Sequence, residues 1–132
     1  VGLIARRADK LAEVAGDNRH AIPLPCDVTH EDEVRHAFAA FVQEVGRLDA
    51  LFNNAGIFTP PGMIDEISLA DWAQAVAVNQ TGMFLCARSA FGHMRRQVPQ
   101  GGRMVNSGSG SAQATREGAE TDTMPCRVCT AD

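Results

Sequence analysis

The stretch LDALFNNAG, residues 48–56, decides the expected fold. Its run at residues 48–52 is mainly apolar without strict alternation, which is typical of a parallel strand buried on both faces. The asparagines then end the strand, and Ala55 and Gly56 are small enough to admit a ligand or another backbone. Because ligands of open α/β sheets bind at the carboxyl ends of the strands, we expect a binding edge here. Taken alone, the stretch fits an ordinary strand and turn better, so the neighbouring segments decide.

The composition is that of a soluble globular protein. The 132 residues, 45% of them hydrophobic and 21% charged, allow one domain with a core. A net charge of −4 provides no basic field, so we expect neither nucleic acid nor an anionic membrane as a partner. No apolar run approaches the ~20 residues of a membrane span and no signal peptide is visible, so we expect a cytoplasmic protein. Because Val1 already lies inside an apolar run, we also expect a fragment of a longer chain.

Apolar runs and helical periods alternate along the chain. We expect strands at residues 1–5, 21–28, 48–52 and 103–106, and helices at residues 8–15, 30–45 and 68–96. This alternation predicts an α/β fold with a Rossmann-like, doubly wound parallel sheet.

Local signals refine three of these elements. Pro23 and Pro25 weaken the second strand or place it at an edge of the sheet. Thr29 and Asp32 resemble a capping box, so we expect Thr29 to be the N-cap of the helix that follows. Ser68 is the expected N-cap of the long helix, whose dense apolar positions predict burial on more than one side.

Residues 114–132 differ in character from residues 1–113, which form the expected domain. They are polar and show neither a helical nor a strand period, so we expect a disordered tail. Cys126 and Cys129 form a C-x-x-C pair, which can be half of a zinc site or a redox motif. Since no second pair accompanies it, the tail is the favoured interpretation and we expect no metal site.

Five short motifs stand in an order that resembles the short-chain dehydrogenase/reductase family. The resemblance covers about residues 1–113, and each motif alone is weak; the motifs are Arg6-Arg7, Asp27-Val28-Thr29, Asn53-Asn54-Ala55-Gly56, Val78-Asn79-Gln80-Thr81-Gly82, and Gly102-Arg103-Met104-Val105-Asn106 running to Ser109. The resemblance implies a Rossmann-like sheet that is incomplete here, lacking the first strand, its glycine-rich turn and the C-terminal part. Since that first strand lies between the second and fourth, we expect two strand pairs with unpaired facing edges and a chain that is not well folded alone.

The resemblance also implies a cofactor site. Asp27 and Val28 would surround the adenine ring, although a surface aspartate before a helix explains Asp27 as well. Asn54, Ala55 and Gly56 would lie along the cofactor, where small side chains leave room for ribose and pyrophosphate.

Arg6 bears on the choice of cofactor. An acidic residue after the second strand bonds the ribose 2′-hydroxyl of NAD, whereas arginine accommodates the 2′-phosphate of NADP. Ala5 occupies the acidic position and Arg6 follows it, so NADP is favoured, with NAD possible. A solvated helix start at Arg6-Arg7 is an equally good interpretation.

Two further positions resemble the family's catalytic residues. Asn79 would distort its helix so that its carbonyl holds a water of the proton relay; an exposed helical asparagine is the alternative. Ser109 would hydrogen-bond the substrate carbonyl or hydroxyl, although Ser107 and Ser111 are close enough to confuse the alignment, and such a run is often a flexible loop.

The family's Tyr-x-x-x-Lys has no counterpart, because the sequence contains no tyrosine. Asp122 and Cys126 stand near its two positions, and neither can replace the tyrosine's proton transfer. Two hypotheses follow. The first is an NADP-preferring oxidoreductase acting on a carbonyl or secondary alcohol, as a homo-oligomer (dimer or tetramer), of which this is an incomplete chain. The second is an inactive truncated, frameshifted or spliced product that associates with full-length homologues through the helix at residues 68–96.

Overall fold

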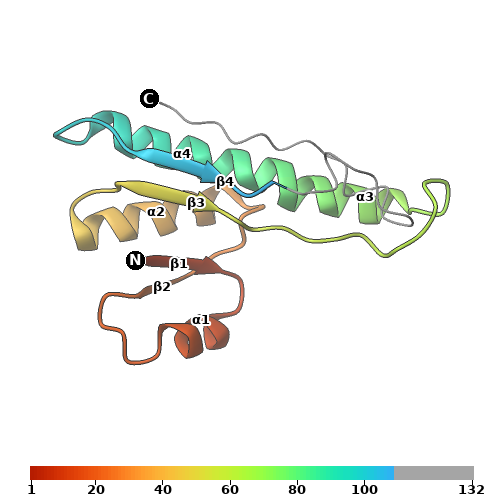
Figure 1. Ribbon diagram of the computed structural model, residues 1–132, viewed down its shortest axis with the longest axis horizontal. Coiled ribbons are helices and arrows are strands. Elements are labelled where there is room, and N and C mark those ends of the chain that lie inside the picture. Colours follow the sequence, from red (N-terminus) through yellow and green to blue (C-terminus); the bar gives the residue numbers. More distant parts are fainter. Residues whose placement is uncertain (109–132) are drawn as a thin grey trace.

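The computed structural model describes residues 1–108, in which strands and helices alternate as expected (Figure 1). The elements are β1 Gly2–Ala5, α1 Ala8–Ala15, β2 Ile22–Pro25, α2 Glu31–Val45, β3 Ala50–Asn53, α3 Leu69–Val76, the π-helix η1 Ala77–Gly82, α4 Met83–Arg96 and β4 Arg103–Asn106. No helix within this part of the chain is long and apolar enough to cross a bilayer.

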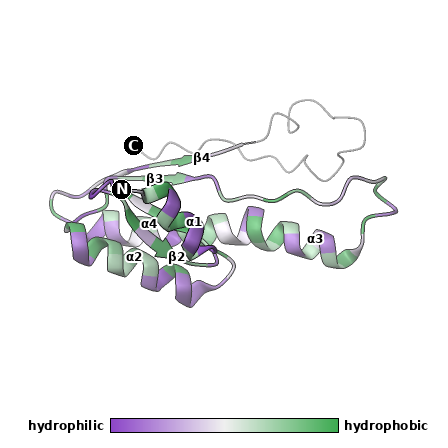
Figure 2. Ribbon diagram, turned by 90° about the horizontal axis from the view of Figure 1, so that it is seen from below, coloured by the Kyte–Doolittle hydropathy of each residue, from purple (hydrophilic) through white to green (hydrophobic). Residues whose placement is uncertain are grey.

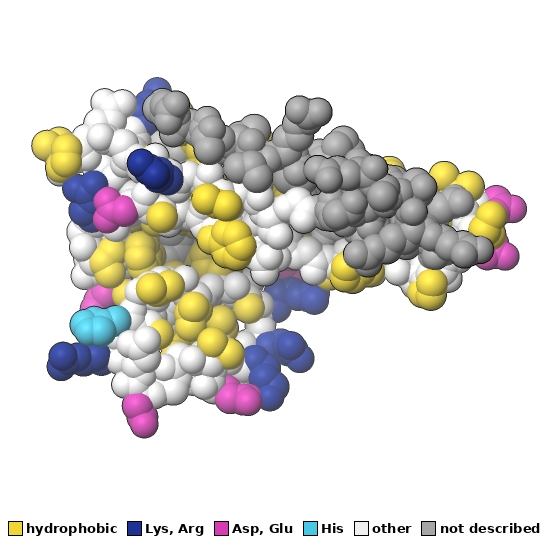
Figure 3. Space-filling view, in the orientation of Figure 1, with side chains coloured by type: hydrophobic (Ala, Val, Ile, Leu, Met, Phe, Trp, Pro, Cys, Tyr) yellow, Lys and Arg dark blue, Asp and Glu magenta, His cyan; other side chains and the backbone are white. Residues whose placement is uncertain are grey.

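The strands form two separate parallel sheets. β1 pairs with β2 and β3 pairs with β4, with Gly2 opposite Ile22 and Ala50 opposite Arg103. Within residues 1–108 no strand connects the sheets, so the expectation of two pairs with unpaired facing edges is confirmed. Figure 3 shows hydrophobic side chains gathered on the face of the molecule where β1 and β3 lie.

One hydrophobic core joins the two halves of the fold. The first half is the sheet of β1 and β2 with α1, and the second is the sheet of β3 and β4 with the long helix. It lies where α2 and α4 pack on each other and on the strands, and Figure 2 shows both helices on one side of β3 and β4. Its buried members are Leu24, Cys26, Val28, Val34, Ala37, Phe38, Leu48, Val78, Leu85, Cys86, Ala90 and Met94. At ~1.5–3 kcal/mol for each large side chain that is fully buried, this core is the main interaction between the two sheets.

The N-cap expected at Thr29 is wrong. α2 begins at Glu31 with His30 as its N-cap, and no side chain caps it. Thr29 instead donates its backbone N–H and its hydroxyl to Asp27 Oδ1, over 2.9 and 2.7 Å. The Asp27 carboxylate, two residues upstream, competes for the threonine and holds it in a turn before the helix.

Two other local expectations are confirmed. β2 is shorter than expected, but both strands of its two-stranded sheet are edges, which suits the missing N–H groups of Pro23 and Pro25. Ser68 caps α3, since its hydroxyl accepts the N–H of Asp71 over 3.0 Å.

The expectation that the long helix is buried on more than one side is wrong. α3, η1 and α4 follow one another without a break, but one face carries large exposed side chains. The exposed fractions are 81% for Leu69, 41% for Trp72, 60% for Phe84 and 52% for Phe91.

Two side-chain amides fasten the long helix to the chain on either side of β3. After α4, Gln97 Oε1 accepts the N–H of Leu48 and Gln97 Nε2 donates to the carbonyl of Leu48, each over 2.9 Å. In η1, Asn79 Oδ1 accepts the N–H of Ile57 over 2.8 Å and Asn79 Nδ2 donates to the carbonyl of Ile57 over 2.9 Å. In both cases the amide's donor and acceptor match those of one backbone residue.

Candidate functional site

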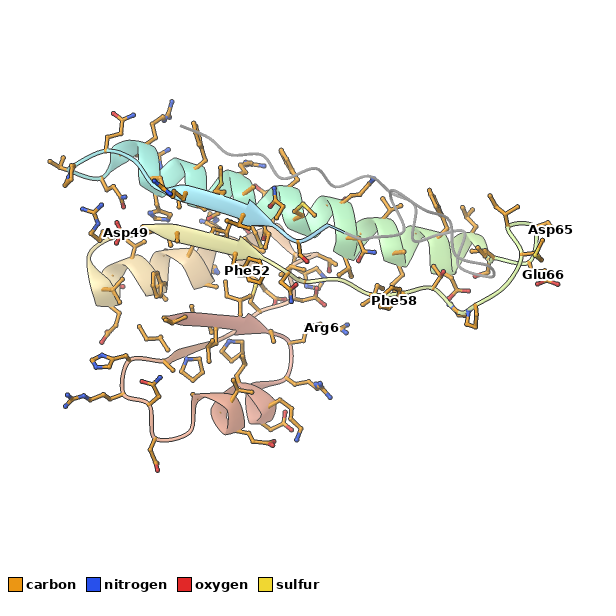
Figure 4. The ribbon with its side chains drawn as sticks, in the orientation of Figure 1. Arg6, Asp49, Phe52, Phe58, Asp65 and Glu66 are labelled. Carbon is orange, nitrogen blue, oxygen red and sulfur yellow. The ribbon has the colours of Figure 1, made fainter. Side chains whose placement is uncertain are left out.

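The residues expected to bind a cofactor lie where the strands end. Figure 1 shows the arrows of β1, β3 and β4 pointing the same way, so their carboxyl ends share one edge of the molecule. Arg6 follows β1, Asp27 and Val28 follow β2, and residues 54–56 follow β3. Figure 4 shows Arg6 beyond the end of β1, whereas Asp49 lies at the opposite end of β3.

Asp27 is held in a network of hydrogen bonds. Its Oδ1 accepts both bonds from Thr29, and its backbone N–H donates to Glu33 Oε2 over 2.8 Å. The N–H of Thr29, then its hydroxyl, and to a lesser degree the positive charge of Arg6 lower the pKa of the Asp27 carboxyl. The carboxylate is therefore ionised at neutral pH, and its Oδ2 accepts no hydrogen bond from the described residues.

The substitution Thr29→Val should raise the pKa of Asp27 toward its ordinary value of 3.8, because it removes the hydroxyl donor. A pKa lowered in the folded state stabilises the fold above the unfolded pKa, and this contribution is lost as the pH falls through the folded pKa. An NMR titration of the Asp27 side-chain carboxyl in both proteins measures the change. An unchanged or lower midpoint in Thr29→Val would contradict this account, and Ser107→Ala serves as a control remote from the carboxyl.

Residues 54–56 form an exposed loop, and the side chain of Asn79 holds the residue that follows it. Asn54, Ala55 and Gly56 are all exposed, and their nearest neighbour along the chain, Ile57, carries both hydrogen bonds from Asn79. A Cβ at Gly56 would lie 3.5 Å from Asn79 Oδ1. The loop is thus held at its base while its small residues stay open to a ligand.

The π-helix η1 places Asn79 beside this loop. The widened turn interrupts the helix at residues 77–82, in line with the distortion expected at Asn79. Such π-helical turns occur often at functional sites. The side chain is engaged with Ile57, which is a contact that the sequence did not indicate.

Gly82 brings the long helix against the end of β2. A Cβ at Gly82 would lie 2.7 Å from Cγ2 of Val28 and 3.3 Å from the Val28 carbonyl oxygen, so only glycine fits without a shift. Val28 is buried by this contact. The position of the adjacent Asp27 therefore depends on the close approach of the helix.

Asn53 is a residue of this edge that the sequence reasoning did not select. It is buried, and its Nδ2 donates to the carbonyl of Met83 and to Oδ1 of Asn106, each over 3.1 Å. Asn53 thereby joins the ends of β3 and β4 to the start of α4. A polar residue that ends a strand beside Phe52 was the available signal, because a buried amide requires partners.

Two of the sequence predictions fall on residues that the structure does not describe. Ser109 and the Cys126–Cys129 pair lie outside the described residues, so their roles stay predictions. The groove between α2 and α4, lined by Val34, Leu85, Arg88 and neighbouring side chains, contains none of the expected site residues.

A model of the family described as short chain dehydrogenase matches residues 1–121. The chain belongs to the short-chain dehydrogenase family. It is 34% identical over 110 residues to a cis-4-hydroxycyclohexanecarboxylate dehydrogenase of Sinomonas cyclohexanicum, covering 83% of this chain and 43% of the relative. It is 40% identical over 89 residues to a secoisolariciresinol dehydrogenase of Forsythia intermedia, covering 65% of this chain and 31% of the relative.

Solved structures of short-chain dehydrogenases have the same fold. A 3-ketoacyl-(acyl-carrier-protein) reductase from Brucella melitensis complexed with NADH matches with a TM-score of 0.88 and 25% identity, over 93% of this chain and 52% of that chain. A variant of actinorhodin polyketide ketoreductase with NADPH matches with a TM-score of 0.84 and 27% identity, over 93% of this chain and 48% of that chain. The chain therefore spans about half the length of these short-chain dehydrogenases, with a parallel Rossmann-type α/β arrangement.

Proposed function

We propose that the carboxyl edge of the strands is the cofactor-binding part of an NAD(P)-dependent short-chain dehydrogenase/reductase. The reaction would be hydride transfer between the nicotinamide and a carbonyl or secondary alcohol. The observation that carries this proposal is that Arg6, Asp27 and the exposed loop at residues 54–56 follow the carboxyl ends of strands that point the same way, with Asn79 bonded to the base of that loop.

The residues at this edge fit a nicotinamide cofactor. Arg6 is exposed, and none of its hydrogen-bonding groups has a partner among residues 1–108, so its guanidinium is available to a phosphate. Asp27 would accept from the adenine amine, Val28 would border the ring, and residues 54–56 would leave room for ribose and pyrophosphate. When bound, the cofactor supplies or accepts the hydride.

The remaining roles concern the reacting oxygen. Ser109 would donate a hydrogen bond to the substrate carbonyl or hydroxyl, as its motif position implies. Asn79 would act as a positioning residue: its side chain holds Ile57, and its carbonyl lies in the π-helical turn, where a relay water would bind.

Arg6→Ala should remove a preference for NADPH over NADH. Loss of a charge-assisted bond to the 2′-phosphate costs ~1.5–3 kcal/mol, which weakens NADPH binding about 10- to 100-fold and leaves NADH binding unchanged. The measurement is calorimetric titration of a chimera in which residues 1–108 replace the matching segment of a complete short-chain dehydrogenase.

Arg7→Ala is the matched control, because Arg7 is the adjacent exposed arginine and the N-cap of α1. It should leave the ratio of the two affinities unchanged. An equal ratio in Arg6→Ala and in the unsubstituted chimera would refute the assignment of Arg6 to the phosphate.

We also propose that the chain associates with a short-chain dehydrogenase partner through its long helix, whether or not it carries out the reaction itself. Leu69, Phe84 and Phe91 are exposed. With the half-buried Val76 they recur at intervals of seven or eight residues, which places all four on one face of the helix. An exposed row of large apolar side chains is typical of a protein–protein interface. The partner would be a second copy or a full-length relative.

The charges flanking this row favour an antiparallel pair of helices. Asp65, Glu66 and Asp71 lie near the start of α3, whereas Arg95 and Arg96 lie at the end of α4. Figure 4 shows Asp65 and Glu66 at the far tip of the loop that leads into α3. In an antiparallel pair, the acidic start of one helix would meet the basic end of the other at both ends of the interface.

Phe84→Lys should weaken this association at least tenfold, because it places a charge in the middle of the apolar row. The measurement is analytical ultracentrifugation of the chain alone and mixed with a full-length relative. Phe58→Lys is the control, since Phe58 is 80% exposed but lies in the loop before α3. Equal effects of the two substitutions would contradict the proposed interface.

In the same samples the chain alone should oxidise no NADPH, because its sequence has no tyrosine for the proton transfer.

A further inference from the structure

Two buried cysteines come from different halves of the fold. Cys26 follows β2 and is 2% exposed, and Cys86 lies in α4 and is 4% exposed. Both are free thiols and both belong to the core that joins the halves. Neither has a part in the function proposed above.

The register between β2 and α4 places these cysteines opposite each other. Figure 1 shows α4 running against the direction of the strands. Side chains return to one face of an extended chain every two residues, or about 6.6 Å, and to one face of a helix every four residues, or about 6 Å. Starting from the contact of Val28 with Gly82, two residues back along the strand and four residues forward along the helix lead to Cys26 and Cys86.

The same contact shows that the two backbones pack closely at the neighbouring turn of the helix. A Cβ at Gly82 would be 2.7 Å from Cγ2 of Val28 and 3.3 Å from the Val28 backbone oxygen, so the helix lies directly against the extended chain. A disulfide requires Cα atoms about 4.4–6.8 Å apart, and the register described above carries this close packing one helical turn further on, to Cys26 and Cys86. The charge of Cys86 also acts on Cys26: after burial, it is the next cause that raises the pKa of Cys26.

We propose that Cys26 and Cys86 form a dithiol that a low-molecular-weight disulfide oxidises to an internal disulfide. One cysteine thiolate attacks a sulfur of the oxidant, which breaks the oxidant's S–S bond and releases one small thiol. The other cysteine thiolate attacks the resulting mixed disulfide at the protein sulfur, forms the internal S–S bond and releases the second small thiol. The two protons of the cysteines end on the two released thiols, so the protein is oxidised by two electrons and the oxidant is reduced by two.

This bond would join parts that no strand connects within residues 1–108. Cys26 donates its backbone N–H to Ala5 at the end of β1, while α4 contacts β3. Closing a loop of about 60 residues raises the ratio of folded to unfolded protein about 10³-fold in the chain-entropy model. Burial raises the pKa of each thiol to about 11, so the bond should form slowly and only when the halves separate locally.

The test uses the full chain with Cys126→Ser and Cys129→Ser, which leaves only the two buried thiols. The protein is equilibrated with reduced and oxidised glutathione, in buffer and in concentrated urea, and the internal disulfide is quantified by peptide mass mapping. The oxidation constant is the equilibrium constant for converting the two thiols to the internal disulfide with oxidised glutathione. It should be at least tenfold larger in buffer than in urea, because the fold holds the two thiols together. The chimera carrying residues 1–108 is measured in the same way, so that the fold is present in at least one sample.

A control variant with one thiol moved along β2 tests whether oxidation depends on the position of the two cysteines. In the same background, Cys26→Ser combined with Leu24→Cys moves the thiol to the next buried position of β2, away from Cys86. This variant should show equal oxidation constants in buffer and in urea. Equal constants for the native pair in both the chain and the chimera, or equally favourable oxidation of the shifted pair, would overturn the proposal.

Discussion

Gly82→Val is expected to lower the free energy of unfolding by about 3 kcal/mol, because it overpacks the contact between the long helix and the end of β2. The added Cβ would lie 2.7 Å from Cγ2 of Val28 and 3.3 Å from the Val28 carbonyl oxygen. The branched side chain has one favoured rotamer in a helix and cannot turn away from this contact. Either the helix moves outward or Val28 moves with the adjacent Asp27, so cofactor binding by the chimera should weaken as well.

Gly92→Ala is the matched control for this substitution. Gly92 lies in the same continuous helix, and a Cβ there would meet only the flexible end of Arg96, 3.4 Å away. Replacing a helical glycine by alanine in open space stabilises by ~0.5–1 kcal/mol, so the two substitutions should shift the urea midpoint of the chimera in opposite directions. Shifts of equal sign and size would show that the close approach at Gly82 has no energetic consequence.

The second large effect is expected for the chain on its own. Two-stranded sheets are marginal in water, and here each sheet depends on the shared core with α2 and α4. We expect a free energy of unfolding below ~5 kcal/mol, at the low end for a globular protein. Hydrogen exchange followed by NMR should find fast exchange along the facing edges of β1 and β3, with slower exchange in α2 and α4. Uniform protection of all four strands would contradict this expectation.

Unpaired strand edges also promote association between chains. Phe52 is 66% exposed on β3, so Phe52→Lys should reduce concentration-dependent aggregation of the chain. Phe58 is more exposed, but it lies in the loop after the strand, so Phe58→Lys should have a smaller effect (Figure 4). Light scattering over a concentration series compares the two. A larger effect of Phe58→Lys would indicate that the association does not involve the edge of β3.

The order of strands and helices was predictable from the sequence because apolar runs, helical periods and end signals agreed. Ser68 is an example: its hydroxyl accepts the N–H of Asp71, while Glu66, two residues upstream, accepts the N–H of Met63 and does not compete for the serine. Thr29 was predicted wrongly because the same pattern contained a second acceptor, Asp27, and only the folded backbone decides between them. A cap motif beside another acidic residue therefore needs geometry as well as spacing.

The site was predictable to the extent that it depends on strand ends. The parallel register brings residues that follow different strands to one edge, which the sequence pattern already implied. The roles of Asn53 and Asn79 were not predictable in this way, because their partners, Met83 and Ile57, are distant in sequence. For the same reason the density of apolar residues in the long helix did not reveal that one face is exposed, since periodicity does not identify what packs against a face.

The paired amide bonds of Gln97 and Asn79 fix how far the long helix can slide along β3. Gln97 bonds Leu48 before the strand and Asn79 bonds Ile57 after it. At each end of residues 48–57, one amide therefore accepts a backbone N–H and donates to the carbonyl of the same residue. A displacement of the helix by one residue would break all four hydrogen bonds together, whereas rotation of the loop tip at residues 60–66 would break none of them. We therefore expect motion at this edge to be confined to the loop beyond Ile57, while the strand and the helix keep their relative position when a ligand displaces that loop.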